Sequence, residues 1–216
     1  MDNASTDPTL ARDYVTALAR GLEVIQAFDA EQPTLTLSEL AQRTKLSAAT
    51  VRRSLITLEH LGYVRRLDRR FMLAPKVLSL GATYFASMNL KEVAQNALVA
   101  LAERTHDAAS LTVLDRFEVV YVAHVPSDQR VQHGRSVGSR LPAHATSTGM
   151  VLMAHASPAH RERLLAMPEL PAFTSRTPVT TEELTTRFAA ALRDDFLVAC
   201  DTIEYGAIAI AVPVRD

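Results

Sequence analysis

Residues 36–73, TLSELAQRTKLSAATVRRSLITLEHLGYVRRLDRRFML, predict two short helices joined by a tight turn and followed by a basic hairpin. Thr36 lies three residues before Glu39, which is the spacing of a capping box, so the first helix begins at Thr36. Ser47 is a good N-cap for the second helix, and Gly62 stands where a left-handed C-terminal cap belongs. A hairpin that directly follows two such helices is typical of a winged helix-turn-helix.

The second of these helices carries apolar residues at i, i+4 and i+7, namely Val51, Leu55 and Leu58, which predicts one buried stripe. Its outward face starts with small residues and continues with arginines, which suits a helix end that approaches a DNA groove closely. The runs 63–66 and 70–73 predict a hairpin with arginines at its tip, which can reach the DNA backbone or the minor groove. We therefore expect DNA contacts at Ser47, Ala48, Ala49, Thr50, Arg52, Arg53, Arg69 and Arg70.

The charge distribution agrees with this prediction. Between Arg43 and Lys76 there are nine Lys or Arg residues and only two acids, Glu59 and Asp68, so the window carries +7 although the whole chain carries −1. A basic module beside a helix-turn-helix pattern is the electrostatic footprint of phosphate binding. The alternative is a solvated basic face on an ordinary helical domain, which would not need the paired helices or the hairpin.

Bulk properties limit the class of protein. The 216 residues are enough for two modest domains, and 48 % hydrophobic with 22 % charged residues is typical of a soluble globular protein. No apolar run is long enough to cross a bilayer, and the polar residues 1–8 do not form a signal peptide. The single cysteine, Cys200, excludes an internal disulfide framework and fits a reducing cytoplasm, and we expect it to be an inert buried thiol.

Patterning divides the chain into four segments. Residues 1–12 are expected to be a loose arm. Residues 13–74 form the DNA-binding domain, in which a first helix over 13–29 packs on the other two helices through Leu18, Leu22, Ile25 and Phe28. Residues 75–89 are expected to be a helical linker, and residues 90–216 a second domain.

The second domain is predicted to be α+β, with an antiparallel sheet and helices packed to one side. Ser157-Pro158 marks a helix start with proline in the first turn, and Thr180 with Glu183 forms another capping box. Leu141–Ala143 is expected to be a loop. Helices are expected over 90–105, 146–156, from 158 and over 180–193, and strands over 109–115, 118–125, 130–137, 196–201 and 207–214.

The best small-molecule site is the start of the helix at Thr146. Backbone N–H groups of Ser147, Thr148 and Gly149 are expected to point outward, and the helix dipole favours an anion there, which suits a carboxylate. The hydroxyls of residues 146–148 add donors. The alternative is that Ser147 and Thr148 simply cap a helix. His144 is expected either to hydrogen-bond a carboxylate or phenol or to be a satisfied loop histidine.

Two other functional classes are compatible with such a second domain. An α+β domain with a pocket could be an enzyme, but the chain holds no Gly-x-Ser-x-Gly, His-Glu-x-x-His, phosphate-binding Gly-rich loop or Cys-x-x-Cys. Its seven histidines show no zinc-ligand spacing. We therefore expect no enzyme, no metal and no cofactor. A structural protein without a ligand is the remaining alternative, and it predicts no stabilisation by small molecules.

Short motifs spread over nearly the whole chain carry a resemblance. The chain resembles the IclR family of bacterial transcriptional regulators, and Ser110–Asp115 with Gly138–Gly149 look most like the branch that controls aromatic-acid catabolism through the β-ketoadipate pathway. No single motif is decisive, but their order and spacing are specific. They are Ala19-Arg20-Gly21-Leu22, Leu37–Ala41 with Leu46, Thr50-Val51-Arg52-Arg53, Leu58–Val64, Leu78-Ser79-Leu80-Gly81, Val137–Ala143, Ala145–Gly149 and Ile210–Val214.

This resemblance implies a winged helix-turn-helix joined by a helix to a GAF-like effector-binding domain. It also implies dimers, often paired into tetramers, on palindromic operators, and an effector that is an aromatic acid, a β-ketoadipate-pathway intermediate or, alternatively, a small keto acid. Thr202 and Met150 depart from residues common in the family, and members normally continue past Val214 with a strand and a helix, so a missing C-terminal segment is expected. The implied pocket adds Leu141, His144, Asp201, Glu204 and Ala209 to residues 146–149.

Overall fold

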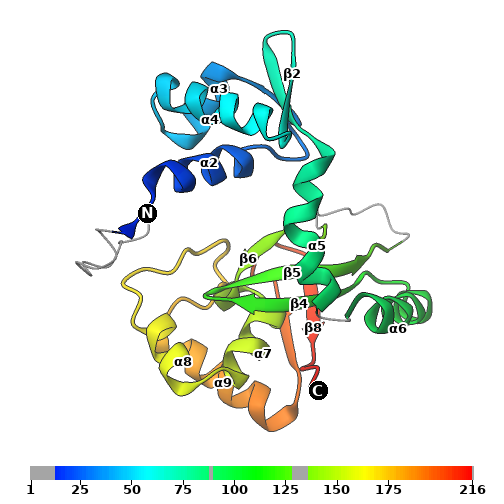
Figure 1. The fold of residues 1–216 in the computed structure, drawn as a ribbon. Helices are drawn as coiled ribbons and strands as arrows, with labels where there is room; N and C mark the ends of the chain where they lie inside the picture. The colour runs from blue at the N-terminus through cyan, green and yellow to red at the C-terminus, as the bar shows by residue number, and fades with distance from the viewer. Residues whose placement is uncertain (1–12, 88–89, 128–135, 216) are drawn as a thin grey trace. The chain divides into compact units, whose positions relative to one another are not determined.

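A computed structural model describes residues 13–87, 90–127 and 136–215 (Figure 1). The chain divides into two compact units, Met1–Ser87 and Met88–Asp216, which we describe separately. No helix in the described part of the chain is long and apolar enough to cross a membrane.

The first unit is a winged helix-turn-helix. Its three strands form one antiparallel sheet in the order β1-β3-β2, in which Leu35 pairs with Phe71 and Arg66 also pairs with Phe71 from the other side. The elements are α2 (Thr16–Gln26), β1 (Thr34–Thr36), α3 (Leu37–Thr44), α4 (Ala48–His60), β2 (Val64–Leu67), β3 (Arg70–Leu73), the 3-10 turn η1 (Pro75–Val77) and α5 (Leu78–Ser87).

Local capping signals define where α3 and α4 begin and end. At the start of α3 the Thr36 hydroxyl accepts the Glu39 N–H at 3.3 Å and the Glu39 carboxylate accepts the Thr36 N–H at 2.7 Å, which confirms the capping box. Gly62 follows α4 with φ of +80°, and the N–H groups of Gly62 and Tyr63 bond back to the carbonyls of Glu59 and Leu58. This is a Schellman ending, which stops α4 at His60, so that the chain can turn into β2 at Val64.

The inward face of α2 differs from the prediction. Val24 is fully buried and Phe28 nearly so, and they pack with Leu35, Leu40 and the predicted stripe of α4. Leu18 and Leu22, which were expected in this core, are 64 % and 46 % exposed. The prediction was wrong because α2 has two apolar faces, and the face with valine and phenylalanine one turn apart is the one that fits between α3 and α4.

The wing also differs in detail. Strand β1 was not predicted, and it converts the expected two-stranded hairpin into a three-stranded sheet. Leu67 belongs to β2, so the turn is only Asp68-Arg69, with Asp68 at a φ of +53°. Aspartate tolerates this left-handed conformation better than most residues, because its short side chain bonds locally.

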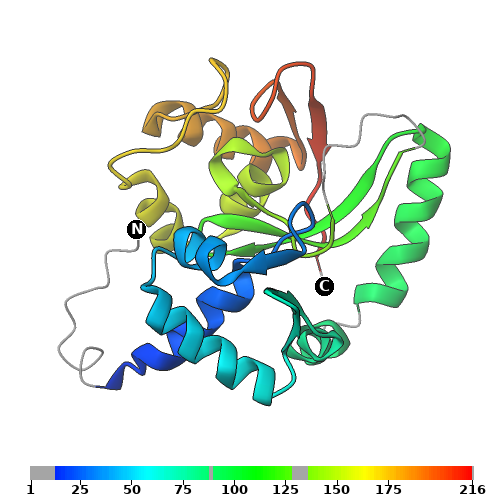
Figure 2. The same ribbon diagram turned by 90° about the horizontal axis from the view of Figure 1, so that it is seen from above.

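The second unit is α+β. Its strands form two antiparallel sheets, in the order β4-β5-β6 and β7-β8, with α6 beside β4 and β5 (Figure 2) and α7 packed against strands of both sheets. The elements are α6 (Leu90–Thr105), β4 (Ala109–Asp115), β5 (Glu118–Val125), β6 (Arg140–Pro142), the 3-10 turn η2 (Ala143–Ala145), α7 (Ser147–His155), α8 (Pro158–Leu165), α9 (Thr181–Asp194), β7 (Leu197–Cys200) and β8 (Ile208–Ala211).

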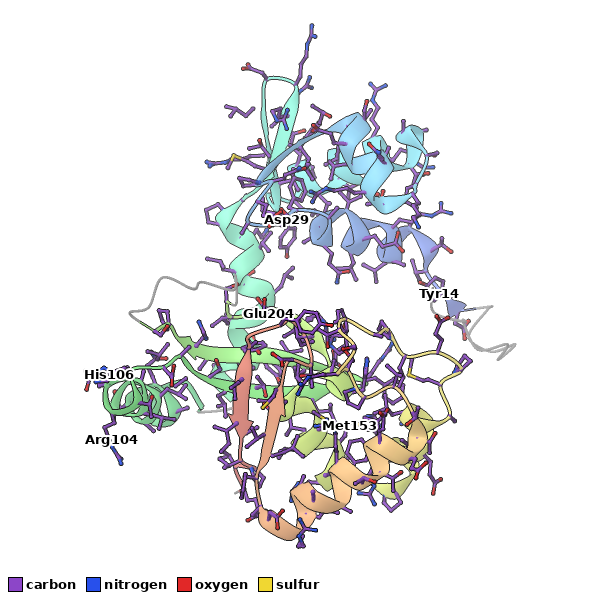
Figure 3. All side chains as sticks on the ribbon, turned by 180° about the vertical axis from the view of Figure 1, so that it is seen from behind. Tyr14, Asp29, Arg104, His106, Met153 and Glu204 are labelled. Atoms are coloured by element: carbon purple, nitrogen blue, oxygen red, sulfur yellow. The ribbon has the colours of Figure 1, made fainter. Side chains whose placement is uncertain are left out.

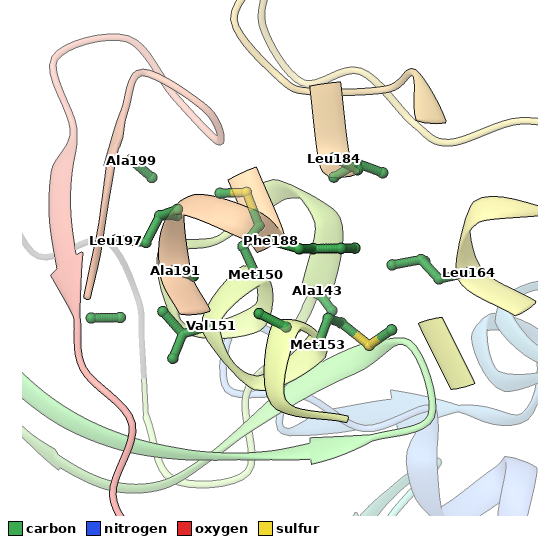
Figure 4. Close-up of a cluster of buried hydrophobic side chains, with 12 residues drawn as sticks. Ala143, Met150, Val151, Met153, Leu164, Leu184, Phe188, Ala191, Leu197 and Ala199 are labelled. Atoms are coloured by element: carbon green, nitrogen blue, oxygen red, sulfur yellow. The ribbon is translucent and has the colours of Figure 1, made fainter. Parts of the chain in front are cut away.

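Helix α7 is the centre of the main core of this unit (Figure 4). Met150 and Met153 of α7 are fully buried against Leu184 and Phe188 of α9. Leu197 and Ala199 reach the same core from β7 because alternate residues of a strand point to one face. Met150, a departure from the family pattern, is therefore a core residue.

Several predictions for this unit need correction. The expected loop Leu141–Ala143 is split between strand β6 and turn η2, since β6 pairs with β5. Cys200 is exposed rather than buried, because it alternates with the inward Ala199. The strand predicted over 207–214 is shorter, and β8 covers only Ile208–Ala211. The strand expected over 130–137 lies largely outside the described residues.

Truncating a side chain in this core should be costly. Leu184→Ala removes a fully buried side chain from α9, so we expect the free energy of unfolding of the second unit to fall by about 2–5 kcal/mol. Leu192, on the same helix, is 49 % exposed, and Leu192→Ala is the matched control, with an expected change of about 0.5 kcal/mol. Urea denaturation of both variants measures the difference, and equal losses would contradict this packing.

Candidate functional site

The exposed face of α4 is shaped at its start by Ser47. The Ser47 hydroxyl accepts the Thr50 N–H at 3.2 Å and lies 2.9 Å from the Thr50 hydroxyl, so these two side chains cap the helix together. Ala48 and Ala49 are exposed beside them and present only methyl groups. The N-terminal turn of α4 is therefore an open, small-residue surface that a nucleic-acid groove can approach without steric hindrance.

Some cations of the basic window are used inside the unit. Arg43 donates to the Ala27 carbonyl at 2.9 Å and to the Asp29 carboxylate at 2.6 Å, so it fastens the end of α2. Arg70 donates to the Thr34 carbonyl at 2.9 Å and to Glu39 at 3.1 Å, so it ties the wing to α3. These arginines stabilise the fold, and carboxylates neutralise their charges.

The remaining cations are free to meet another molecule. Arg52 and Arg53 are exposed on α4, and Arg65 and Arg69 are exposed on the wing. None of the four side chains has a hydrogen-bond or ion-pair partner among residues 13–87. Among the four arginines of the predicted DNA contacts, Arg52, Arg53 and Arg69 thus have unpaired side chains. The fourth, Arg70, is paired.

In the second unit, Thr146 is the N-cap of α7. Its hydroxyl accepts the Gly149 N–H at 3.0 Å and donates to the Pro142 carbonyl at 3.4 Å. The prediction that residues 147–149 all offer free N–H groups is therefore wrong for Gly149, because the cap takes that donor. The N–H groups of Ser147 and Thr148 make no hydrogen bond within the described part of the chain.

Thr148 holds a polar atom that the fold does not satisfy. Its hydroxyl oxygen is buried from solvent and has no hydrogen-bond partner among the described residues. Leaving a buried hydroxyl unpaired costs about 1–3 kcal/mol, so this hydroxyl at the start of α7 is a candidate donor to a bound molecule. The alternative that residues 147 and 148 are the cap does not hold, since Thr146 caps the helix.

Gly149 has a packing role. A Cβ at this position would lie 2.3 Å from both the Cα and the carbonyl oxygen of Ala143 and 2.6 Å from the Thr146 hydroxyl. Only glycine lets turn η2 lie directly against the first turn of α7. This contact places His144 and Thr146 at the start of the helix.

His144 is a buried anchor for the segment 171–177. The side chain is 2 % exposed, its Nε2 donates to the Pro171 carbonyl at 3.0 Å, and its ring stacks on Phe173. Burial lowers the pKa of His144 below its ordinary value, which favours the neutral ring. Of the two expectations for this residue, the satisfied loop histidine describes its contacts.

The turn between β7 and β8 is fastened to the same segment. The Asp201 carboxylate accepts the Gly206 N–H at 2.6 Å, and the Asp201 carbonyl accepts from the Thr174 hydroxyl at 2.5 Å. The Thr177 hydroxyl donates to the Thr202 carbonyl at 2.7 Å. Residues 171–177 were not among the predicted site residues, although threonines that bond to loop backbone are a recognisable signal.

The predicted ligand residues fall into four places. His144 and residues 146–149 are consecutive, and Asp201 and Glu204 share the β7–β8 turn, where Figure 3 labels Glu204. One carboxylate oxygen of Glu204 is buried from solvent. Leu141 lies in β6 opposite Val119, and Ala209 lies in β8 opposite Ala199, in different sheets. No cluster of three or more metal-ligating side chains occurs among the described residues.

Comparison with known proteins decides the family. Residues 17–68 match the IclR helix-turn-helix domain, and residues 82–216 match the bacterial transcriptional regulator IclR C-terminal domain. The chain belongs to the IclR family. It is accordingly a DNA-binding transcriptional regulator with a winged helix-turn-helix and a C-terminal effector-binding domain, and the enzyme alternative is set aside because IclR homologues are regulators.

Two relatives illustrate the similarity. The Pca regulon regulatory protein of Pseudomonas putida is 37 % identical over 205 residues, which are 94 % of this chain and 70 % of that protein. The p-hydroxybenzoate hydroxylase transcriptional activator of Acinetobacter baylyi is 37 % identical over 220 residues, covering 98 % of this chain and 80 % of the activator.

Solved IclR structures share the fold. An IclR homologue of Microbacterium hydrocarbonoxydans, complexed with 4-hydroxybenzoate, has a TM-score of 0.82 at 30 % identity, covering 93 % of this chain and 83 % of its own. A putative transcriptional regulator of a Rhodococcus species has a TM-score of 0.77 at 40 % identity, covering 94 % and 81 %.

The buried His144 makes stability depend on pH. Its folded-state pKa lies below the ordinary 6.5, so the unfolded chain binds the proton more readily. Its contribution to the free energy of unfolding is complete above pH 6.5 and is lost as the pH falls through the folded pKa. Urea denaturation between pH 8 and 5 should show this loss as a fall in the free energy of unfolding, with a slope that corresponds to uptake of at most about one proton on unfolding. His144→Gln should remove this pH dependence.

His60 is exposed on α4, so His60→Gln is the control and should leave the pH profile unchanged. A profile that is the same for the wild type and for His144→Gln would show that His144 is not held neutral by the fold.

Proposed function

We propose that this IclR regulator senses an aromatic carboxylic acid of the 4-hydroxybenzoate type at the start of α7. The observation that carries the proposal is the buried, unpaired Thr148 hydroxyl beside the free N–H groups of Ser147 and Thr148. A carboxylate accepts hydrogen bonds from all three donors, and the positive end of the helix dipole stabilises its charge.

The comparisons support an aromatic acid over other anions. The Acinetobacter relative is by name an activator of p-hydroxybenzoate hydroxylase, and the Microbacterium homologue was crystallised with 4-hydroxybenzoate. A small keto acid is the alternative effector. The proposed site comprises His144, Thr146 to Gly149, Asp201, Glu204, Leu141 and Ala209, in which Thr146, Gly149 and His144 shape the site and Ser147 and Thr148 donate to the acid.

On the DNA side, α4 enters the major groove and the wing follows the backbone. Ser47 to Thr50 present a small surface to the bases, Arg52 lies near bases or phosphates, and Arg53 positions the helix on the backbone. Arg69 extends the contact through the wing, while Arg70 holds the wing in place through Glu39. The regulator acts in the cytoplasm as a homodimer, or as a pair of dimers, on a palindromic operator.

The effector acts through the linker. Residues 13–74 bind the operator, the linker 75–89 contains η1 and α5, and residues 90–216 bind the acid. The acid thereby biases the placement of paired DNA-binding domains. Such coupling is reciprocal, and effector affinity must differ with and without operator DNA.

Thr148→Val tests the effector site. The substitution keeps the shape but removes the unpaired hydroxyl, so we expect equal or higher stability without ligand and a smaller rise in melting temperature with 4-hydroxybenzoate. Thr146→Val is the matched control, because it removes the N-cap and should lower stability by about 1 kcal/mol. Thermal unfolding of the full chain with and without the acid measures both effects.

If 4-hydroxybenzoate raises the melting temperature of Thr148→Val as much as that of the wild type, the acid does not bind at the start of α7. If pyruvate or glyoxylate stabilises the wild-type protein and 4-hydroxybenzoate does not, the effector is a small keto acid and not an aromatic acid.

Arg69→Ala and Arg70→Ala separate DNA contact from wing support. Arg69 is unpaired, so its removal should weaken binding to any duplex and reduce the slope of log affinity against log salt by about 0.9 per bound subunit. Arg70 is paired with Glu39, so its removal should lower the stability of the first unit and change the slope less. Fluorescence anisotropy over a salt series and urea denaturation provide the two readouts, and the reverse pattern would contradict this assignment.

A further inference from the structure

The wing ends in an exposed leucine. Leu67 is the last residue of β2, immediately before the turn Asp68-Arg69, and its side chain is 58 % exposed. Val64, at the other end of the same strand, is buried in the core of the first unit. Turns at hairpin tips favour polar residues and glycine, so a leucine at this point is unusual. Because single exposed apolar residues are common, exposure alone does not identify a site.

The strand register directs Leu67 away from the core. Residues 65 and 67 lie on the opposite face of β2 from the buried Val64, since side chains alternate along a strand. The cross-strand neighbour of Leu67 is Arg70, which extends toward β1 and α3 and donates to residues of both. This arrangement explains why Leu67 stays exposed at the tip.

The tip is held in a fixed position. The Nε of Arg66 donates to the Asp68 carbonyl at 2.7 Å, and the Arg66 guanidinium lies over the ring of Phe71, 5.8 Å from its centroid. Phe71 in turn packs against the core of the first unit. Only two residues join β2 to β3, so the wing ends in a narrow tip that presents Leu67 in a preorganised position.

The charge around this leucine indicates which molecule it meets. Arg65 and Arg69 flank it, and neither side chain has a partner among residues 13–87. Asp68 is the only acid between Gly62 and Lys76. An apolar side chain surrounded by cations is complementary to a groove of DNA, where phosphates border the stacked bases.

We propose that Leu67 is a wedge that enters the minor groove beside the α4 contacts and inserts between two stacked base pairs. Apolar wedges of this kind partly unstack one base step and kink the duplex toward the major groove. Unstacking costs least at pyrimidine–purine steps, so Leu67 selects for such a step without any hydrogen bond to a base. The inference rests on the proposed function, in which α4 lies in the major groove and the wing lies along the neighbouring backbone.

Selection from a pool of random-sequence duplexes, followed by sequencing, tests the wedge without an operator being known. The full chain is used as wild type, as Leu67→Met and as Leu67→Gln, two side chains of similar length that differ in polarity. Position 67 is exposed, so neither substitution should affect folding. Wild type and Leu67→Met should enrich the same flexible steps beside the α4 site, and Leu67→Gln should lose this enrichment while keeping the bases under α4.

The bend is measured on the duplex that the wild type enriches most. Energy transfer between dyes at the two ends should report a bend with wild type and with Leu67→Met, and a smaller bend with Leu67→Gln. We expect Leu67→Gln to bind this duplex several-fold more weakly with an unchanged slope of log affinity against log salt, because leucine carries no charge. Arg69→Ala is the electrostatic control, in which the slope should fall.

Four results would overturn the proposal. The same enriched steps and the same bend with Leu67→Gln as with wild type would reject the wedge and leave the proposed function intact. A smaller salt slope in Leu67→Gln would show that the substitution disturbs the arginines beside it. Loss of the bases under α4 in Leu67→Gln would show that the tip sets the position of α4 and does not select a step. A wild type that enriches no sequence would contradict both the wedge and the operator binding proposed above.

Discussion

The close contact between Gly149 and Ala143 is the constraint on which the effector-binding unit depends. It lets turn η2 lie against the first turn of α7, with no room for a Cβ between them. His144 is thereby directed toward Pro171, and Thr146 is left at the position where it can cap the helix. Helix α7 then packs against strands of both sheets, so the same contact connects the candidate effector site to the main core.

In the DNA-binding unit, the pairing of charges determines how the basic surface can be used. Arg43 and Arg70 are committed to Asp29 and Glu39, and these pairs join α2 to α3 and the wing to α3. Each exposed pair contributes little stability alone, but both add geometric constraint through bonds to backbone carbonyls. The arginines without partners project from elements whose positions these pairs define.

Sequence predicted best what depends on neighbours in the chain. The capping boxes at Thr36 and Thr180 and the glycine ending at Gly62 are signals within a few residues, and all three were confirmed. Of the predicted face of α2, Ile25 and Phe28 were confirmed, but Leu18 and Leu22 were wrongly placed in the core. Strand β1 was missed because it depends on pairing with distant residues. In the candidate site, a helix starting at Thr146 was predicted from the local pattern. The role of residues 171–177 was not predicted, because their contacts lie about 25 to 30 residues away in sequence.

The hydroxyl of Thr148 has a consequence for how this protein and its relatives diverge. A buried group that weakens the empty fold is retained by selection only while its binding partner contributes to fitness. Once a duplicated copy no longer needs to sense the acid, valine at this position relieves the defect in a single substitution. Under the proposed function, the residue at position 148 is therefore a marker of whether a descendant still senses its acid.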